Sequence, residues 1–515
     1  MKRHFDLAIV GSGFTGSLLA MIARRLGHSV VLLEKTSHPR FAIGESSTPL
    51  ANLLLEELAM RYDLPRLLPL CKWGEWQRTY PKIGCGLKRG FSFYHHQFGR
   101  AFGDARDRSD QLLVAASPHD EIADTHWYRP DFDHFFVREA QELGVEYLDE
   151  TALDAPEFHS DGVTLKGKRH GQDIHVHARF LVDATGPRGF LHRALNLEEV
   201  VSPTLPPIQA LYTHFSGVDR LEGNLDFYGE VPPYPVDDAA LHHVFEGGWI
   251  WVLRFNNGLT SAGVAANEEV ANRLRFQDGA PAWKSLLEQL PTVQQQFERA
   301  IPTREFVHAK QLAFRSQTIV GPKFALLPSA AGFVNPLLSM GFPLALLGVS
   351  RLARIIDEDW ESDRFEANLQ GYADYTRNEL IAAEELIAAL YANMDDFALF
   401  KSLTLLYFAA ASFSETVRRL DKPELAGGFL LHNNPRFGEQ SRACFARART
   451  RLNAQQRQEL MAQIQHIVEP FDVAGLTNGE RNNWYPVLAE DLFAAKDKVG
   501  ASRAELELLL KRGGF

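Results

Sequence analysis

The sequence predicts an α/β protein with a nucleotide-binding βαβ unit, an inserted β-sheet and a helical C-terminal region. Three observations support this class. The N-terminal residues follow strand, glycine turn, helix and strand in order, residues 84–116 and 200–300 are rich in strand patterns punctuated by proline, and helical periodicity takes over beyond Gly341. We therefore expect a core at 1–350 that contains the inserted sheet, and a helical region at 351–515 that shapes a pocket.

Composition favours a globular, cytoplasmic protein. The 515 residues exceed one ordinary core, and 45% hydrophobic with 23% charged residues exclude disorder by composition. The net charge of −11 argues against a nucleic-acid partner. We expect no signal peptide and no apolar run of membrane-spanning length. Cys71, Cys85 and Cys444 are too widely spaced for a metal or disulfide framework, so we also expect no metal.

The N-terminal βαβ unit is predicted in detail. Residues 5–10 form an apolar run typical of a buried parallel strand, residues 17–26 have helical character up to Gly27, and a second strand runs over 29–34. This order of elements is the one that a dinucleotide-binding unit requires.

The residues at the turn of this unit are candidate cofactor contacts. Gly11, Gly13 and Gly16, with Thr15 between them, allow a tight turn and bring the backbone close to a pyrophosphate at the helix N-terminus. Glu34, at the end of the second strand, can accept hydrogen bonds from ribose hydroxyls. The unit alone does not distinguish FAD from NAD.

The segment after Glu34 favours FAD. Pro39-Arg40 and Gly44-Glu45-Ser46 resemble the PRxxxGE segment of flavin-dependent halogenases and related flavin monooxygenases, in which the arginine and the Glu-Ser region contact the flavin. A solvated loop is the alternative for Arg40 and Glu45. Arg129 opens a helix that extends to Leu143, and both a flavin contact and an ordinary salt bridge at the helix start are open for it.

A third apolar strand, 180–183, ends in Asp183-Ala-Thr-Gly, which resembles the family's nucleotide sheet strand with small residues beside the cofactor. The sequence has no second strand–GxGxxG–helix unit. The resemblance therefore implies that reduced flavin arrives from a separate NAD(P)H-dependent flavin reductase.

Residues Phe333 to Gly341 resemble the Fx.Px.Sx.G signature of flavin-dependent halogenases, and Phe333, Pro336 and Ser339 are its matching positions. The resemblance implies a PHBH-like flavin monooxygenase architecture. It also implies that the backbone amides of Met340 and Gly341, at a helix start, hold chloride or bromide beside the flavin.

Ser329 and Gly332 precede this motif and are further candidate cofactor contacts. Pro328-Ser329 stands where many flavoproteins have Gly-Asp. A serine can still cap the following helix or hydrogen-bond a phosphate, but it adds no negative charge.

Lys88 is the candidate catalytic residue. The segment 84–93 has the alternation of a strand and resembles the halogenase segment that carries the catalytic lysine. Its amine can hydrogen-bond hypohalous acid or be halogenated itself, and partial burial would lower its pKa and assist. An exposed strand lysine, like Lys82, is the alternative.

Trp249 and Trp251 resemble the WxWxIP motif, which walls off the flavin in the family, and they are predicted to share one strand face. Leu253 replaces isoleucine and Arg254 replaces proline. A buried arginine would need a partner. Two ordinary core tryptophans are the alternative.

Leu338 stands where tryptophan halogenases carry a catalytic glutamate, so the pattern is closer to the phenol-type halogenases. His95, His96 and His243 are candidate bases by residue type only. Aromatic residues on the expected helices could touch an arene, although most should be core: Phe397, Phe400, Tyr407, Phe408 and Phe413.

The resemblance implies an FADH2-dependent halogenase that uses O2 and chloride or bromide to halogenate an electron-rich, phenolic aromatic, either free or tethered to a carrier protein. Two alternatives stay open: a flavin-dependent hydroxylase on the same scaffold, which Arg254 motivates, and a flavin-binding protein that has lost turnover, which Arg254 and Ser329 motivate together.

Overall fold

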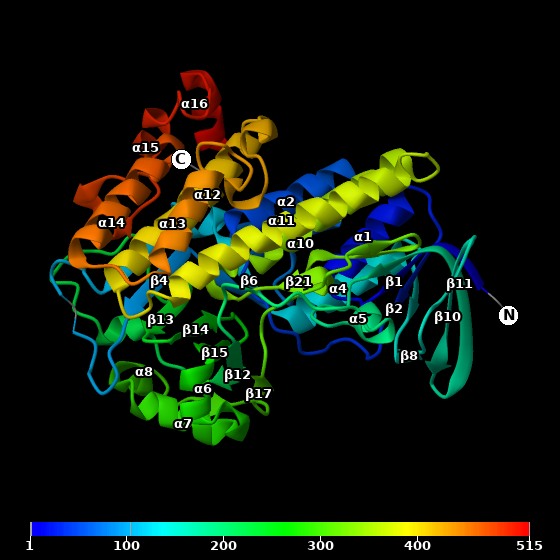
Figure 1. Cartoon of the computed structure of the whole chain (residues 1–515), viewed down its shortest axis with the longest axis horizontal. Helices are drawn as coiled ribbons and strands as arrows, with labels where there is room; N and C mark the ends of the chain where they lie inside the picture. Colours follow the sequence, from blue (N-terminus) through cyan, green and yellow to red (C-terminus); the bar gives the residue numbers. More distant parts are fainter. Residues whose placement is uncertain (1–2, 104, 514–515) are drawn as a thin grey trace.

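The computed structural model describes residues 3–103 and 105–513 and confirms the α/β class (Figure 1). Two nine-stranded sheets form the molecule, together with a group of C-terminal helices. The nucleotide-binding half lies at the right of Figure 1, the second sheet at the lower left, and the C-terminal helices above that sheet.

The first sheet has the order β19-β20-β11-β1-β2-β7, and β1 pairs in parallel with both β2 and β11. Its apolar strands are buried by helices, as their sequences predict. The helix α1 (Phe14–Arg25) begins three residues before the predicted Ser17, because Gly13 is its extended N-cap. The strands are β1 (Arg3–Val10), β2 (Val30–Leu33), β7 (Glu146–Leu148), β8 (Thr151–Leu153), β9 (Glu157–His159), β10 (Gly162–Arg169), β11 (Gln172–Asp183), β19 (Val320–Gly321) and β20 (Phe324–Leu326).

The second sheet has the order β16-β12-β15-β14-β13-β4-β5-β22, with β17 also pairing β12. Its last strand comes from the C-terminal region, which the sequence did not predict. The strands are β4 (Gly90–His95), β5 (Gln111–Ala115), β12 (Ile208–Ser216), β13 (Ala240–Phe245), β14 (Gly248–Arg254), β15 (Leu259–Asn267), β16 (Ile301–Pro302), β17 (Val307–Ala309) and β22 (Trp484–Tyr485).

The predicted strand over 84–93 is two strands. The first, β3 (Cys85–Lys88), pairs with β6 (Asp124–Trp127) outside both large sheets, and the second is β4. Arg89 separates them, because its amide donates to the carbonyl of Asp238 at 2.6 Å and leaves the line of the strand. Lys88 therefore ends a short ribbon at the margin of the second sheet.

The two faces of the second sheet pack into different cores. Side chains of Trp249, Trp251 and Leu253 join the larger core, whereas Ile250 and Val252 join a smaller one with Trp283 and Leu286 of α7. Helices α6 (Glu268–Leu274), α7 (Ala280–Glu288) and α8 (Pro291–Gln296) belong to that outer side. The face of a β14 residue thus decides which part of the molecule it serves.

The chain beyond Gly341 is mainly helical, as predicted. The longest helix, α11 (Phe365–Tyr391), crosses the molecule from the C-terminal group to the nucleotide half in Figure 1. Two shorter helices of this region are α13 (Gly438–Ala448) and α15 (Ala489–Ala494). The others are α10 (Gly341–Asp359), α12 (Phe397–Arg419), α14 (Ala454–Val468) and α16 (Arg503–Arg512), and earlier in the chain α2 (Pro49–Arg61), α3 (Trp73–Thr79), α4 (Arg129–Glu142), α5 (Phe190–Ala194) and α9 (Pro328–Ala331).

Two helices correct the expectation that no apolar run reaches membrane-spanning length. The stretch 337–359, which contains α10, and α12 are each long and apolar enough to cross a membrane. Their apolar windows are 78% and 72% buried within the fold, so their hydrophobic surface packs against the rest of the chain. Both therefore serve as core helices in this structure.

We predict that Gly11→Ala destabilises the fold more than Gly27→Ala. Both glycines have positive φ, +102° and +92°, so each alanine incurs about 1–2 kcal/mol of left-handed strain. A Cβ on Gly11 would also lie 2.6 Å from the backbone of Ala184, whereas Gly27 has open space around it. Overlap adds about 1–3 kcal/mol. Chemical denaturation of the two variants measures the difference, and equal midpoints would contradict the prediction.

Candidate functional site

The glycine turn presses against the strand that carries Asp183. A Cβ on Gly16 would lie 2.0 Å from the carbonyl oxygen of Gly11, so neither position accepts a larger residue. Gly13 faces a polar group, with the Arg129 guanidinium 3.4 Å from its Cβ position. Thr15 is buried in the first turn of α1, where helix amides have no carbonyl partners. The turn therefore offers backbone donors to a phosphate.

Glu34 lies beside this turn and binds it. The Oε2 atom of Glu34 accepts from the backbone amide of Ser12 at 3.1 Å and from the Ser12 hydroxyl at 3.0 Å. Arg40 donates to the same oxygen at 3.2 Å. Burial alone would raise the pKa of Glu34, but Arg40 and the hydrogen bonds outweigh burial and lower it. Glu34 is thus held as a carboxylate at the position predicted for ribose recognition.

The loop with Glu45 and Ser46 is built into the molecule, which contradicts the solvated-loop alternative for Glu45. Its Oε1 is 2.8 Å from Nε2 of His214 on β12, and the side chain is fully buried. Three buried polar atoms of this loop have no hydrogen-bond partner among the described residues: Glu45 Oε2, Ser46 Oγ and Ser47 Oγ. Unsatisfied buried oxygens are costly, so their concentration here suits a polar ligand.

Arg129 forms the salt bridge at the helix start that was one of the two roles left open for it. Its guanidinium forms a two-pronged pair with Asp133, with both bonds at 2.8 Å, and also donates to the carbonyls of Ile43 and Gly44. It therefore connects the start of α4 to the loop that precedes Glu45. Asp183 is engaged differently, because its carboxylate accepts from Thr185 and Leu191 in the following loop.

These features fit a flavin dinucleotide. Backbone atoms leave no room for a side chain at Gly11 or Gly16, and the start of α1 supplies amides. The unpartnered oxygens lie on the Glu45–Ser47 loop, which follows Glu34 along the chain. Within residues 3–103 and 105–513, no group of three or more His, Cys, Asp or Glu residues could hold a metal ion.

The segment from Phe333 to Gly341 forms a tight curl ahead of α10. Leu338 and Ser339 have positive φ values of +66° and +55°, which strain non-glycine residues and recur at functional sites. Gly341 begins α10 and is exposed, so its amide lies among the unpaired donors of a helix start. The left-handed Ser339 followed by a right-handed Met340 is the backbone pattern of an anion-binding nest.

A small cavity of about 30 Å³ connects this curl to the residues predicted to hold the cofactor. Ser329 and Gly332 line it together with Asn335, Met340 and Gly341. Phe333 pairs with Phe314 in a two-stranded ribbon, and Pro336 is half-buried. Two of the predicted cofactor contacts, Ser329 and Gly332, therefore lie in the same cavity as the predicted halide contacts.

Lys88 is fully buried, which contradicts the alternative of an exposed lysine. Its Nζ donates to the carbonyl of Ser47 at 2.5 Å and to Oγ of Ser339 at 3.5 Å. It also lies 3.8 Å from the centre of the Phe91 ring. The amine thus joins the loop after Glu45 to the Phe333–Gly341 curl.

Asp124 is the carboxylate nearest in register to Lys88. The two residues are cross-strand partners in the β3–β6 ribbon, and Asn52 donates to Asp124 Oδ1 at 2.9 Å. Burial lowers the pKa of Lys88, and the charge of Asp124 opposes that shift. Burial likewise raises the pKa of Asp124. No local pattern predicted this pairing, because the two positions lie 36 residues apart along the chain.

Trp249 and Trp251 lie on one face of β14, with ring centres 5.7 Å apart. The indole of Trp249 donates to the hydroxyl of Tyr391 at the end of α11, and the amide of Asn335 donates to the same hydroxyl at 3.1 Å. Tyr391 therefore ties the tryptophan pair to the Phe333–Gly341 curl. This link was missed in the sequence because Tyr391 ends an otherwise ordinary helix.

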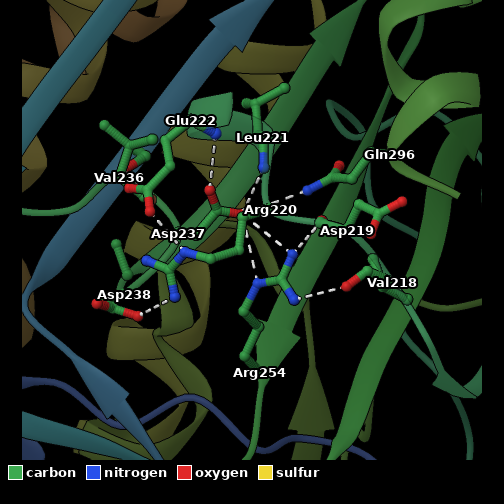
Figure 2. A network of polar contacts seen from close by, with 12 residues as sticks. Val218, Asp219, Arg220, Leu221, Glu222, Val236, Asp237, Asp238, Arg254 and Gln296 are labelled. Carbon is green, nitrogen blue, oxygen red and sulfur yellow. Dashed lines mark hydrogen bonds and ion pairs between the residues drawn. The ribbon is translucent and has the colours of Figure 1, made fainter. Parts of the chain in front are cut away.

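By the alternation along β14, Arg254 lies on the face of Ile250 and Val252, opposite Trp249 and Trp251. Figure 2 shows its guanidinium directed toward Asp237 and the carbonyls of Val218 and Asp219. Its guanidinium pairs with the buried carboxylate of Asp237 at 3.2 Å and donates to the carbonyls of Val218 and Asp219. Asp237 also accepts from the amides of Leu221 and Glu222. Arg254 therefore has the partner that a buried arginine needs, Asp237, and it anchors the Val218–Asp219 loop without contacting the two tryptophans.

A cavity of about 170 Å³ lies on the other side of Phe91 from the second sheet's outer core. Thr48, which follows Ser47, and Pro343, two residues after Gly341, line it as well. The cavity therefore includes Phe91, which Lys88 contacts, and Thr48, which follows its partner Ser47. Of the five aromatic residues predicted on the C-terminal helices, Tyr407 and Phe408 line it, and the other three pack elsewhere.

The three candidate histidines do not line this cavity. His96 and His243 contact each other at 2.9 Å, and His243 contacts Gln296 on the outer side of the sheet. His95 stacks on Phe397 and faces Asp110. Their residue type was a misleading criterion, because the alternation of strand faces decides which side a histidine serves.

Comparison with known proteins gives three findings. The family described as FAD dependent oxidoreductase matches residues 6–318. The chain is 30% identical over 421 residues to monodechloroaminopyrrolnitrin halogenase PrnC of Pseudomonas fluorescens, covering 79% of this chain and 71% of that protein. It is also 30% identical over 391 residues to tetracycline 7-halogenase of Kitasatospora aureofaciens, covering 72% and 68%.

Among solved structures, halogenase PltM in complex with phloroglucinol and FAD superposes with a TM-score of 0.82. The sequence identity is 23%, and the alignment covers 93% of this chain and 99% of that one. This likeness extends the agreement in fold into the C-terminal helices.

We predict that Arg254→Met destabilises the fold by about 3 kcal/mol, because it leaves the buried Asp237 carboxylate without its cation. Arg275→Met is the matched control, since the exposed Arg275–Asp278 pair should contribute less than about 1 kcal/mol. Denaturant unfolding measures both. The folded Arg254→Met variant should bind flavin as tightly as the unmodified protein. A selective loss of flavin binding would contradict the conclusion that Arg254 and the two tryptophans serve opposite faces of β14.

Proposed function

The chain belongs to the FAD-dependent oxidoreductases and, among them, to the flavin-dependent halogenases, and on this premise we propose that it halogenates an electron-rich, phenol-type aromatic through hypohalous acid directed by Lys88. The observation that carries the proposal is the position of the Lys88 amine. It bonds to Ser47 on one side and Ser339 on the other, and it contacts the ring of Phe91, which lines the cavity.

The cofactor and the halide fit the residues around this amine. Reduced FAD, when bound, supplies two electrons to O2, and halide supplies two more, which yields hypohalous acid and water. Gly11, Gly13, Thr15 and Gly16 would hold the pyrophosphate, and Glu34 the ribose. The loop and helix residues Arg40, Glu45, Ser46, Arg129, Asp183, Ser329 and Gly332 would surround the rest, with Met340 and Gly341 at the halide.

The chain's own residues would then guide the oxidant. Trp249 and Trp251, with Phe333, Pro336 and Ser339, would separate the cofactor from the substrate, so that hypohalous acid rather than cofactor meets the arene. Lys88 would accept the oxidant from the Ser339 side and present it toward Phe91 and the cavity. A buried amine with a lowered pKa is partly neutral, which is the form that reacts with hypohalous acid.

The partners follow from the same premise. We propose a separate NAD(P)H flavin reductase and a cytoplasmic location, which three buried, unpaired cysteines support. We also propose that residues 351–515 shape the substrate pocket of a core at 1–350, since α12 and the segments after it supply much of the cavity lining.

The substrate itself is proposed as a free small aromatic. Relatives at 23% and 25% identity are named for a 1H-pyrrole-2-carbonyl group on a peptidyl-carrier protein, whereas the names of the two relatives at 30% include no carrier. Phloroglucinol, held in the halogenase PltM structure, is a phenol and supports the phenol-type class. Arg254 was the main reason to consider a hydroxylase or a protein without turnover. It points away from Trp249 and Trp251, so its presence no longer favours either alternative.

We predict that Lys88→Met abolishes halogenation while flavin oxidation continues. Enzyme, FAD, a flavin reductase, NADH, O2 and bromide or chloride are incubated with electron-rich phenols, and products are identified by mass spectrometry. Losing the group that delivers the oxidant should lower product formation by about 100-fold or more. Lys82→Met, at an exposed site, is the matched control. Halogenated product at unchanged rate in Lys88→Met, or hydroxylated product independent of halide, would contradict the proposal.

We predict that Asp124→Asn moves the acid limb of the pH profile of kcat/KM to lower pH. The charge of Asp124 raises the pKa of Lys88 against burial, so its removal lowers that pKa further. Neutral amine then persists to lower pH. Asp120→Asn, which alters an exposed partner of Arg89, should leave the limb in place. A shift of the limb to higher pH in Asp124→Asn would contradict this assignment.

A further inference from the structure

The cavity beside Lys88 is lined mainly by apolar residues, and one of its lining residues is charged. Among its lining residues, Glu415 of α12 is the single one with a charged side chain. Thr48, Tyr407, Ser412 and Thr416 supply hydroxyl groups, and the remainder are Pro, Leu, Val, Ala and Phe residues. A pocket of this composition orients its ligand through the few polar groups that it contains.

Glu415 is held in place but keeps an oxygen for a ligand. Its Oε1 accepts from Nε of Arg419, one helical turn on, at 2.7 Å. Its Oε2 bonds to no other residue in the described part of the chain, and the side chain is 20% exposed. Since Glu415 lines the cavity, that remaining accessibility includes the cavity side. Arg419 is itself steadied by Glu56 at 3.8 Å.

Glu415 also lies within reach of the Lys88 group. Asp124 is the common neighbour, because the charges of both Lys88 and Glu415 act on its carboxyl group, as does that of Arg419. A ligand in the cavity would therefore have the Lys88 side at Phe91 and the carboxylate of Glu415 within one compartment.

We propose that Glu415 is the substrate-recognition residue: its free carboxylate oxygen accepts a hydrogen bond from a hydroxyl or amino group carried on the aromatic ring. This proposal rests on the proposed halogenase function and adds the chemical requirement for its substrate. The ligand needs an apolar aromatic body and one ring-bound donor. An ether or an unsubstituted arene would cover the free carboxylate oxygen without donating a hydrogen bond to it, which is costly.

The same bond favours the reaction. An O–H or N–H group that donates to a carboxylate pushes electron density into the ring, toward the carbons conjugated with it. The new bond then forms between one of these carbons and the halogen, as the O–X bond of hypohalous acid breaks. The hydroxide that leaves takes up the proton released from the ring carbon as water, and the donor proton shared with Glu415 returns to its oxygen or nitrogen.

Binding tests this proposal independently of turnover. Three probes are titrated calorimetrically into FAD-loaded enzyme: 1-naphthol, 1-aminonaphthalene and 1-methoxynaphthalene, which lacks the donor. Glu415→Gln keeps the side chain's size and its oxygen for Arg419. We expect this variant to bind naphthol and aminonaphthalene about tenfold or more weakly, and methoxynaphthalene unchanged, because a charge-assisted hydrogen bond is lost. The two donor-bearing probes show whether hydroxyl or amino is preferred.

Two controls separate recognition from packing. Glu57→Gln removes the partner of Arg418, the neighbouring cation on α12, and lies outside the cavity, so it should bind all probes as the unmodified protein does. Lys88→Met should also keep naphthol affinity while losing halogenation.

The outcomes are distinguishable. Equal naphthol affinity in Glu415→Gln and the unmodified enzyme, or no preference of the unmodified enzyme for naphthol over its methyl ether, overturns the role of Glu415. Selective binding that depends on Glu415, without halogenated product from any phenol, overturns the proposed function and leaves the recognition site standing.

Discussion

The bond from the Lys88 amine to the carbonyl of Ser47 and the hydroxyl of Ser339 is the constraint on which the site depends. It brings together three segments that the chain separates by 41 and 251 residues. One carries the buried loop after Glu45, one is the curl before α10, and one is the short β3–β6 ribbon. Since the amine is fully buried, its position is fixed by these partners rather than by solvent.

Burial gives this arrangement its chemistry as well as its geometry. A lysine in an apolar wall is partly neutral, and the opposing charge of Asp124 limits how far its pKa falls. Leu338 and Ser339 add backbone strain to the cost of burying this site, because left-handed backbone persists only where the surrounding structure enforces it. Tyr391 supplies that enforcement at one point, through its bonds to Trp249 and Asn335.

Local patterns predicted much of the fold and several site positions, because their signals lie within a few residues of one another. The βαβ unit and the buried strand of Asp183 are of this kind. Asp124 and Glu415 were not predicted, since tertiary structure alone brings them near Lys88. The break at Arg89 and the late strand β22 escaped for the same reason, as each depends on a partner far along the chain.

Strand β14 has a consequence for how such sequences diverge. Its odd positions, which include the two tryptophans, face the larger core, and its even positions face the outer core. The residues of one short motif are therefore selected for two different roles. Under the proposed function, substitutions at 249 and 251 are constrained by the path of the oxidant, whereas substitutions at 254 are constrained by the packing of a loop around Asp237. An arginine in place of proline is then a change of scaffold, and it carries little information about which reaction the protein has kept.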